Sequence, residues 1–186
     1  MGRGEDAIAT FRALIKVRPG EARNIGCLGT ILLGRRQREE GLKTLDQAIA
    51  ASRATIERRP GDAGEYHLLG YLLAARGDPD GAIAAYRDSL RIEPGHTGAL
   101  TNLVTMLRNW GDQDGIIAVL RTAIRDRPDH AWLHEALSAA LQAKGDPDGA
   151  IAEIREAIRL NPEQQEYRTQ LSALLKSQRD STMPSP

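Results

Sequence analysis

Apolar residues recur three or four positions apart along this chain, the spacing that places side chains on one side of an α-helix. The segment 61–94 contains two such stripes, separated by a Gly-Asp pair that begins at Gly77. The apolar or small positions are Tyr66, Leu69, Leu73, Ala82, Tyr86 and Ser89. This pattern predicts two amphipathic helices joined by a tight turn.

The two-helix pattern repeats at a fixed distance. The second half of the segment, GDPDGAIAAYRDSLRIEP, returns as GDPDGAIAEIREAIRLNP at 145–162, with the first eight residues identical. The closing prolines Pro60, Pro94, Pro128 and Pro162 each lie 34 residues after the previous one. A fixed period in this range is typical of stacked repeat arrays. The sequence therefore predicts three regular units, at 61–94, 95–128 and 129–162.

Each turn carries residues that end one helix and begin the next. The glycines Gly77, Gly111 and Gly145 can adopt the left-handed conformation that closes a helix. Asp78 and Asp146 can accept hydrogen bonds from the free amides at a helix start, with proline at the first helical position. The D-x-D spacing also suits a metal, but capping accounts for its repetition at every turn.

The flanking segments depart from the regular unit. Residues 5–19 match only a second helix and predict a half repeat, whereas 20–60 predicts a repeat with seven residues too many. Seven residues are about two helical turns. We therefore predict one long helix over 39–58, whose tip projects past the stack. After Pro162, residues 163–179 predict a capping helix, and 180–186 a disordered tail.

These residues together resemble the tetratricopeptide repeat, a helix–turn–helix unit of period 34. The resemblance covers 1–179 as a single array, and it is carried by the period, the turn glycines, the small residues and the closing prolines. It implies an all-α fold: a right-handed superhelix of stacked repeats, an α-solenoid, with a C-terminal capping helix. First helices of each unit would line a concave groove, and second helices the convex back.

The resemblance also indicates which residues would face a ligand in that groove. They lie on each first helix opposite its apolar stripe: Arg23, Thr30, His67, Tyr71, Thr101, Thr105, Arg108, Asn109, Trp132, Glu135 and Gln142. Family members that clamp a carboxylate carry Lys and Asn at several of these slots, and here only Asn102 matches a common Asn slot. An extended or helical peptide with hydrogen-bonding groups fits this mixed surface better.

Histidines and tryptophans are the remaining candidates for specific chemistry. His67 is interpreted as a groove-wall residue because no nucleophile or paired acid accompanies it. His134 occupies a packing position, and His96 and His130 are interpreted as solvated residues at helix starts. Trp132 is predicted to be an exposed binding anchor, whereas Trp110 is predicted to cover a turn.

The half repeat leaves a possible second interface. Without a preceding helix, the apolar side chains of Ile8, Phe11 and Leu14 would be uncovered. Exposed apolar patches on soluble proteins are often interfaces. The sequence therefore predicts either self-association through this N-terminal edge, giving a homodimer, or a natural protein that continues upstream.

Composition narrows the functional classes. The 25 Lys and Arg balance 25 Asp and Glu, which argues against a general nucleic-acid surface. Cys27 has no internal disulfide partner and stands among apolar residues, so it is predicted to be buried. No signal core or bilayer-length apolar run is present, which predicts a cytoplasmic protein. Abundant Ala, Arg and Gly suggest a bacterial source.

The preferred function is a non-enzymatic scaffold that binds a protein or peptide segment in its groove. The sequence has no zinc-spaced histidines, no phosphate loop after a strand and no nucleophile motif, so we predict no cofactor, metal or catalytic residue. Two alternatives stay open: the repeat domain of a larger glycosyl- or sulfo-transferase, or a secretion chaperone.

Overall fold

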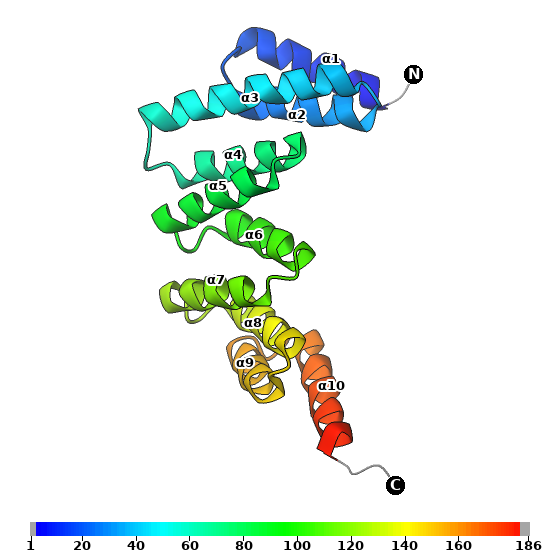
Figure 1. Ribbon diagram of the computed structural model, residues 1–186, viewed down its shortest axis with the longest axis vertical. Helices are drawn as coiled ribbons and strands as arrows, with labels where there is room; N and C mark the ends of the chain where they lie inside the picture. The colour runs from blue at the N-terminus through cyan, green and yellow to red at the C-terminus, as the bar shows by residue number, and fades with distance from the viewer. Residues whose placement is uncertain (1–2, 183–186) are drawn as a thin grey trace. The chain divides into compact units, whose positions relative to one another are not determined.

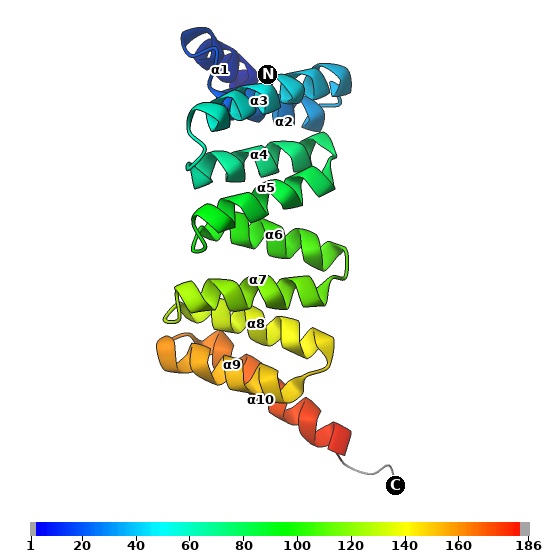
Figure 2. The same ribbon diagram turned by 60° about the vertical axis from the view of Figure 1, so that its left-hand side comes forward.

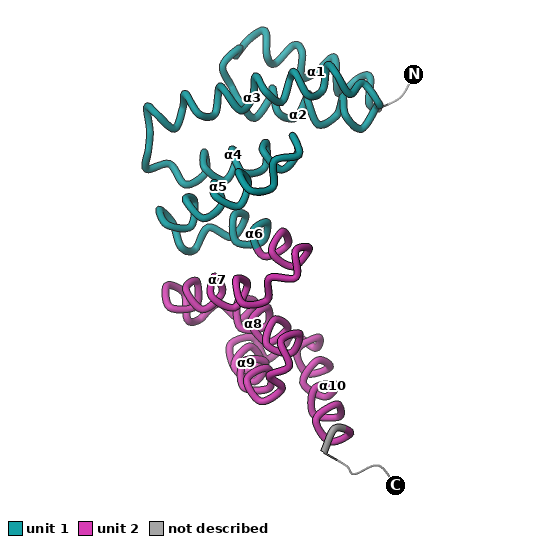
Figure 3. Tube along the Cα trace, in the orientation of Figure 1, with its two compact units in different colours: residues 1–103 teal, residues 104–186 magenta. Residues whose placement is uncertain are grey.

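The computed structural model describes residues 3–182, and over these residues it contains ten α-helices and no strand. The helices are α1 (Arg3–Val17), α2 (Ala22–Gly34), α3 (Arg38–Arg58), α4 (Ala63–Arg76), α5 (Pro79–Ile92), α6 (Thr97–Asn109), α7 (Gln113–Asp126), α8 (Ala131–Lys144), α9 (Pro147–Leu160) and α10 (Gln165–Thr182) (Figure 1). The all-α class predicted from the sequence is confirmed. The chain divides into two compact units, 1–103 and 104–186, with the boundary inside α6 (Figure 3).

In the first unit, helices that follow one another in sequence pack side by side. Each of α1 to α4 contacts the next helix, and α3, α4 and α5 follow one another in both views (Figures 1 and 2). Apolar stripes meet between them and leave several large side chains with less than 2% of their surface exposed. They include Leu32, Leu45, Leu72 and Leu100. Full burial of one leucine contributes about 1.5–3 kcal/mol, so the stack itself stabilises the helices.

The second unit is built in the same way. Helix α8 packs against α7 and α9, and α9 packs against α10. Its fully buried side chains include Leu107, Ile116, Leu120, Leu133 and Ile154. The buried Ser138 hydroxyl donates a hydrogen bond to the Ala150 carbonyl at 2.7 Å.

The turn residues take the predicted conformations. Gly77, Gly111 and Gly145 have φ values of +94°, +73° and +85°. The carboxylates of Asp78, Asp112 and Asp146 accept hydrogen bonds from the amides of Gly81, Gly115 and Gly149 at 2.8–2.9 Å. These contacts satisfy free amides at the helix start, and so capping, rather than metal binding, explains the repeated aspartates.

The long helix also agrees with its prediction. Helix α3 has 21 residues, whereas α5, α7 and α9 have 14 each. Its C-terminal end reaches beyond the N-terminal end of α2 (Figure 1). Its N-terminal part crosses α2 closely, because a Cβ added at Gly29 would lie 3.1 Å from the Leu45 backbone nitrogen.

Two sequence-based expectations need correction. The helix α10 continues through Asp180 to Thr182, so disorder does not begin at 180; the first residue unable to continue a helix is Pro184. Residues 1–2 and 183–186, with the rest of the predicted tail, lie outside the described residues. Cys27 is half-buried rather than buried, because it shares a side of α2 with Arg23 and Thr30.

Candidate functional site

The predicted ligand residues of the first unit lie on one side of its first helices. We call the side of α2, α4 and residues 97–103 of α6 that carries Arg23, His67, Tyr71 and Thr101 the first-helix face. Arg23 and Thr101 are exposed, His67 is half-buried, and 44% of the Tyr71 surface is exposed. The Thr30 hydroxyl donates to the Cys27 carbonyl of its own helix at 2.9 Å. The face therefore offers aromatic surface and polar groups together.

His67 is the centre of a polar cluster on this face. The distance from its Nε2 to the Asn102 Nδ2 is 3.1 Å, and its ring centroid lies 4.9 Å from that of His96. Because an amide Nδ2 can only donate, Nε2 accepts this bond, and the neutral imidazole carries its proton on Nδ1. Nδ1 thus becomes the donor of His67.

Asn102 also connects this cluster to the core. The Tyr86 hydroxyl forms a hydrogen bond with the Asn102 side chain, and burial raises the pKa of Tyr86 to about 12. Only 2% of the Tyr86 surface is exposed, and a Cβ at Gly70 would lie 2.5 Å from the tyrosine ring. Gly70 therefore leaves room for the ring, and the ring fixes the amide that holds His67.

Charge around His67 is positive. Burial lowers the pKa of His67, and the nearby His96 and Arg23 lower it further. The imidazole is therefore biased towards its neutral form, in which Nε2 accepts from Asn102 and Nδ1 is left as a donor. The cluster can bind uncharged polar groups such as peptide amides.

This shift predicts how stability depends on pH. Because the pKa of His67 is lower in the folded protein than its ordinary value of 6.5, the unfolded chain binds more protons just below that pH. The free energy of unfolding should fall as the pH drops through 6.5 and level off below the folded-state pKa. Urea unfolding between pH 5 and 8 measures the effect; His67→Gln should remove this component, and an unchanged pH profile would contradict the assignment.

The second unit brings a different set of groups together. Burial raises the pKa of Glu135 on α8, and Arg108 on α6 partly opposes this shift. The pKa of Tyr167 on α10 is raised by burial first and then by Glu135 and Glu166. Of the remaining predicted residues, Thr105, Asn109 and Gln142 are exposed. The ionisable groups that influence one another in this unit, Arg108, Glu135 and Tyr167, thus differ in kind from those of the His67 cluster.

Trp110, rather than Trp132, is the more exposed of the two tryptophans. Trp110 follows the end of α6 and has 52% of its surface exposed. Trp132 is half-buried, because it lies in the first turn of α8 with its ring edge-on to His130 at 6.3 Å. The exposed aromatic of this unit is thus Trp110.

The loop histidines are also less solvated than predicted. His96 is half-buried, and its Nδ1 accepts a hydrogen bond from the Ala99 amide at 3.1 Å, so it does lie at a helix start. His130 is likewise half-buried at the N-cap of α8. His134 is buried as expected, with Nδ1 2.7 Å from a Glu153 carboxylate oxygen and Nε2 2.9 Å from the Pro128 carbonyl oxygen.

The N-terminal edge is better covered than the sequence suggested. Ile8 and Phe11 are half-buried because α1 packs on α2. Leu14 and Val17 keep 43% and 79% of their surfaces exposed. The apolar patch on this edge is therefore confined to the end of α1, and self-association through Ile8, Phe11 and Leu14 remains a prediction.

Several residues of these clusters were missing from the predicted site. The sequence pattern does not assign ligand roles to four of them: Tyr86, His96, Asn102 and Tyr167. Of these, only Asn102 occupies a position where the family commonly has Asn. Asn102 follows His67 by 35 residues, one more than the repeat period. That spacing places it beside His67 on the neighbouring first helix, and it is the signal that could have identified it.

Two kinds of feature were sought among the described residues, metal-ligand groups and membrane-spanning helices. Within residues 3–182, no three His, Cys, Asp or Glu side chains gather in a way that could hold a metal ion. None of the helices in this range is both long enough and apolar enough to cross a bilayer.

Comparisons with known proteins agree with this architecture. Models of the tetratricopeptide repeat match residues 63–106 and 117–177. No curated protein matches the sequence.

Solved structures match over most of the chain. The C-terminal part of a tetratricopeptide repeat protein from Cytophaga hutchinsonii has a TM-score of 0.72 at 14% identity, covering 98% of this chain and 69% of that one. MamA from Desulfovibrio magneticus RS-1 has a TM-score of 0.58 at 21% identity, covering 86% of each chain. YrrB, a tetratricopeptide repeat protein with an unusual peptide-binding site, has a TM-score of 0.58 at 16% identity, covering 89% of this chain and 82% of that one. These matches confirm the predicted fold class.

Proposed function

This chain belongs to the tetratricopeptide repeat family of protein–protein interaction scaffolds, and from that premise we propose that it binds a segment of a partner protein on the first-helix face. The segment would lie across α2, α4 and the start of α6, where Arg23, His67, Tyr71 and Asn102 are available. This proposal concerns the first unit alone.

The observation that carries the proposal is the arrangement of His67. The imidazole is held by Asn102 at 3.1 Å and half-buried, yet the adjacent Tyr71 is exposed. A side chain whose position is fixed before binding loses less conformational entropy when a ligand arrives. Tyrosine and arginine are common interface anchors, and this face carries both in Tyr71 and Arg23.

The chemistry of the face indicates the kind of segment. The neutral imidazole and the Asn102 amide can pair with main-chain amides and carbonyls, and the Tyr71 ring can cover an apolar side chain. Arg23 adds one positive charge. An extended or helical peptide with exposed hydrogen-bonding groups can pair with all of these side chains. We expect a binding free energy of about −8 kcal/mol, which corresponds to a roughly micromolar dissociation constant. The peptide-binding site named for YrrB, which shares the fold, supports the same reading.

The test is capture of native partners by variants that keep the fold. Tyr71→Ala with His67→Ala should lower recovery of specific partners in pull-down mass spectrometry by at least about tenfold, equivalent to about 1.4 kcal/mol. Arg87→Ala, at an exposed position on α5, is the matched control and should capture partners normally.

Circular dichroism checks that both proteins retain their helices. If the double variant recovers the same partners in the same amounts as the control, the first-helix face is not the binding site.

A further inference from the structure

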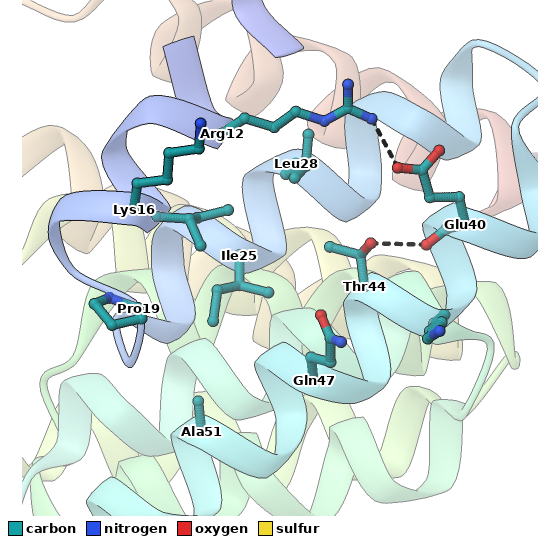
Figure 4. Close-up of a pocket in the computed structure, with 11 residues that line it drawn as sticks. Arg12, Lys16, Pro19, Ile25, Leu28, Glu40, Thr44, Gln47 and Ala51 are labelled. Carbon is teal, nitrogen blue, oxygen red and sulfur yellow. Dashed lines mark hydrogen bonds and ion pairs between the residues drawn. The ribbon is translucent and has the colours of Figure 1, made fainter. Parts of the chain in front are cut away.

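A groove of about 670 Å³ lies on another side of the first unit, between α1, α2 and α3. Its volume falls in the range of typical binding sites, roughly 300–1,000 Å³. Ile25 and Leu28 of α2 form its floor, α1 supplies one wall and α3 the other (Figure 4).

This groove does not face the same way as the proposed peptide site. At about 100° per residue, Arg23 and Thr30 lie about 20° apart around α2, whereas Ile25 and Leu28 lie about 140–200° from Arg23. The two surfaces are therefore on nearly opposite sides of one helix, and a ligand could occupy one without blocking the other.

One end of the groove is closed by an ion pair. Arg12 of α1 donates to a Glu40 carboxylate oxygen of α3 at 2.8 Å, above Leu28 (Figure 4). At the other end Pro19 and Ala51 face each other without such a bridge (Figure 4). The extra turns of α3 continue from there, and Arg18 and Arg58 line an adjoining hollow of about 410 Å³. Arginines outnumber glutamates in the lining of this hollow, four to two.

The groove walls carry polar groups that the described chain leaves available. Lys16 on α1 and Lys43 on α3 line the groove, and neither has an ion-pair partner among residues 3–182. The Gln47 amide points into the groove (Figure 4) and likewise has no hydrogen-bond partner in that range. The groove therefore suits a ligand with three kinds of group. Apolar side chains would pack on the floor, carboxylates would pair with the two ammonium groups, and amides would hydrogen-bond to Gln47.

The charge of the surrounding sequence points the same way. Residues 1–60 contain twelve Lys and Arg against seven Asp and Glu, whereas residues 61–186 contain thirteen against eighteen. The zero net charge of the chain thus conceals an excess of five positive charges in its first third, where the groove lies. Such an excess attracts acidic partners and raises their association rate.

We propose that this groove is a second docking site and that its occupant is an acidic amphipathic segment of a partner protein. Apolar side chains of the segment pack on Ile25 and Leu28, and its carboxylates pair with Lys16 and Lys43. A nucleic acid would match the charge but has no aliphatic side chains to pack on the half-buried Ile15 and on Ile25 and Leu28, which keep 6% and 7% of their surfaces exposed, so the peptide satisfies the groove more completely.

A designed peptide tests the site directly. The probe is a fluorescent 16-residue helix with Leu three and four positions apart and Glu at the flanking positions. Its fluorescence anisotropy should rise on titration with the full chain. Lys16→Glu with Lys43→Glu should weaken binding by at least about tenfold, and added salt should weaken binding to the unmodified protein. Lys176→Glu, exposed on α10, is the control and should bind normally.

A second variant tests the apolar part separately. Gln47→Trp places a large side chain in the groove and should block the peptide, whereas Gln142→Trp, exposed on α8, should not. Equal binding of a scrambled peptide of the same composition, or binding unaffected by both groove variants, would overturn the proposal.

Two further measurements separate the alternatives. The His67→Ala and Tyr71→Ala variants should bind this probe normally, so failure at one surface does not imply failure at the other. If sedimentation shows that the chain alone forms a dimer that Lys16→Glu and Lys43→Glu dissociate, the occupant is a second copy and the proposal is wrong.

Discussion

Replacing Tyr86 with alanine is expected to lower the free energy of unfolding by about 3–5 kcal/mol, the usual cost of truncating a buried aromatic residue. The ring is 98% buried, since only 2% of its surface is exposed. Gly70 on α4 lies against the ring and has no side chain that could fill the cavity. Chemical denaturation monitored by circular dichroism measures the loss.

Tyr86→Phe separates the ring from the hydroxyl. It keeps the packing and removes only the hydrogen bond with Asn102, so it should cost about 0.5–1.5 kcal/mol. If Tyr86→Ala and Tyr86→Phe were equally destabilising, packing of the ring would not be the dominant contribution. The Phe variant should also loosen Asn102 and weaken capture of partners that require His67.

Replacing Gly29 with valine is expected to destabilise the first unit by about 1–3 kcal/mol, because the added carbons have no room between α2 and α3. A Cβ at this position would lie 2.9 Å from the Leu45 Cγ and 3.1 Å from its backbone nitrogen. The side chain of Leu45 can rotate away, but the backbone of α3 can move only if the helices separate. The higher helix propensity of valine offsets a small part of this cost.

Gly34→Val is the matched control for the same helix. Gly34 is the last residue of α2, is exposed, and has nothing within 4 Å of an added Cβ. Its substitution should change stability by no more than about 0.5 kcal/mol. Equal effects at the two positions would mean that helix propensity, rather than the close crossing, governs the response to substitution.

Local chemistry explains why so much of the fold could be predicted from sequence. A turn such as Gly77-Asp78-Pro79 is formed by residues that are adjacent in sequence. Its glycine ends one helix and its aspartate caps the next, so the turn can be predicted without knowing the neighbouring repeats. The length of α3 could be predicted because its repeat has seven residues more than the regular unit. Seven residues are about two helical turns, so they lengthen the helix and leave its apolar stripe on nearly the same side. The end of α10 had no such signal before Pro184, and there the prediction was wrong.

The candidate site depends on neighbours from other repeats, which explains the errors there. Trp132 was predicted to be exposed from its position on α8, but its exposure is decided by the residues around it, including His130. The partnership of His67 and Asn102 joins two first helices, and the sequence shows it only through the 35-residue separation. Periodicity defines which side of a helix a residue occupies, but not which neighbouring side chain it will contact.

The turns at Gly77 and Gly145 also bear on how the protein folds during synthesis. Each joins two 14-residue helices that pack against each other, so each hairpin closes over about thirty consecutive residues. Contacts so close in sequence form quickly, and a repeat array can begin to fold at any of its units. The hairpin of α4 and α5 can therefore assemble while the ribosome is still adding α8 and α9.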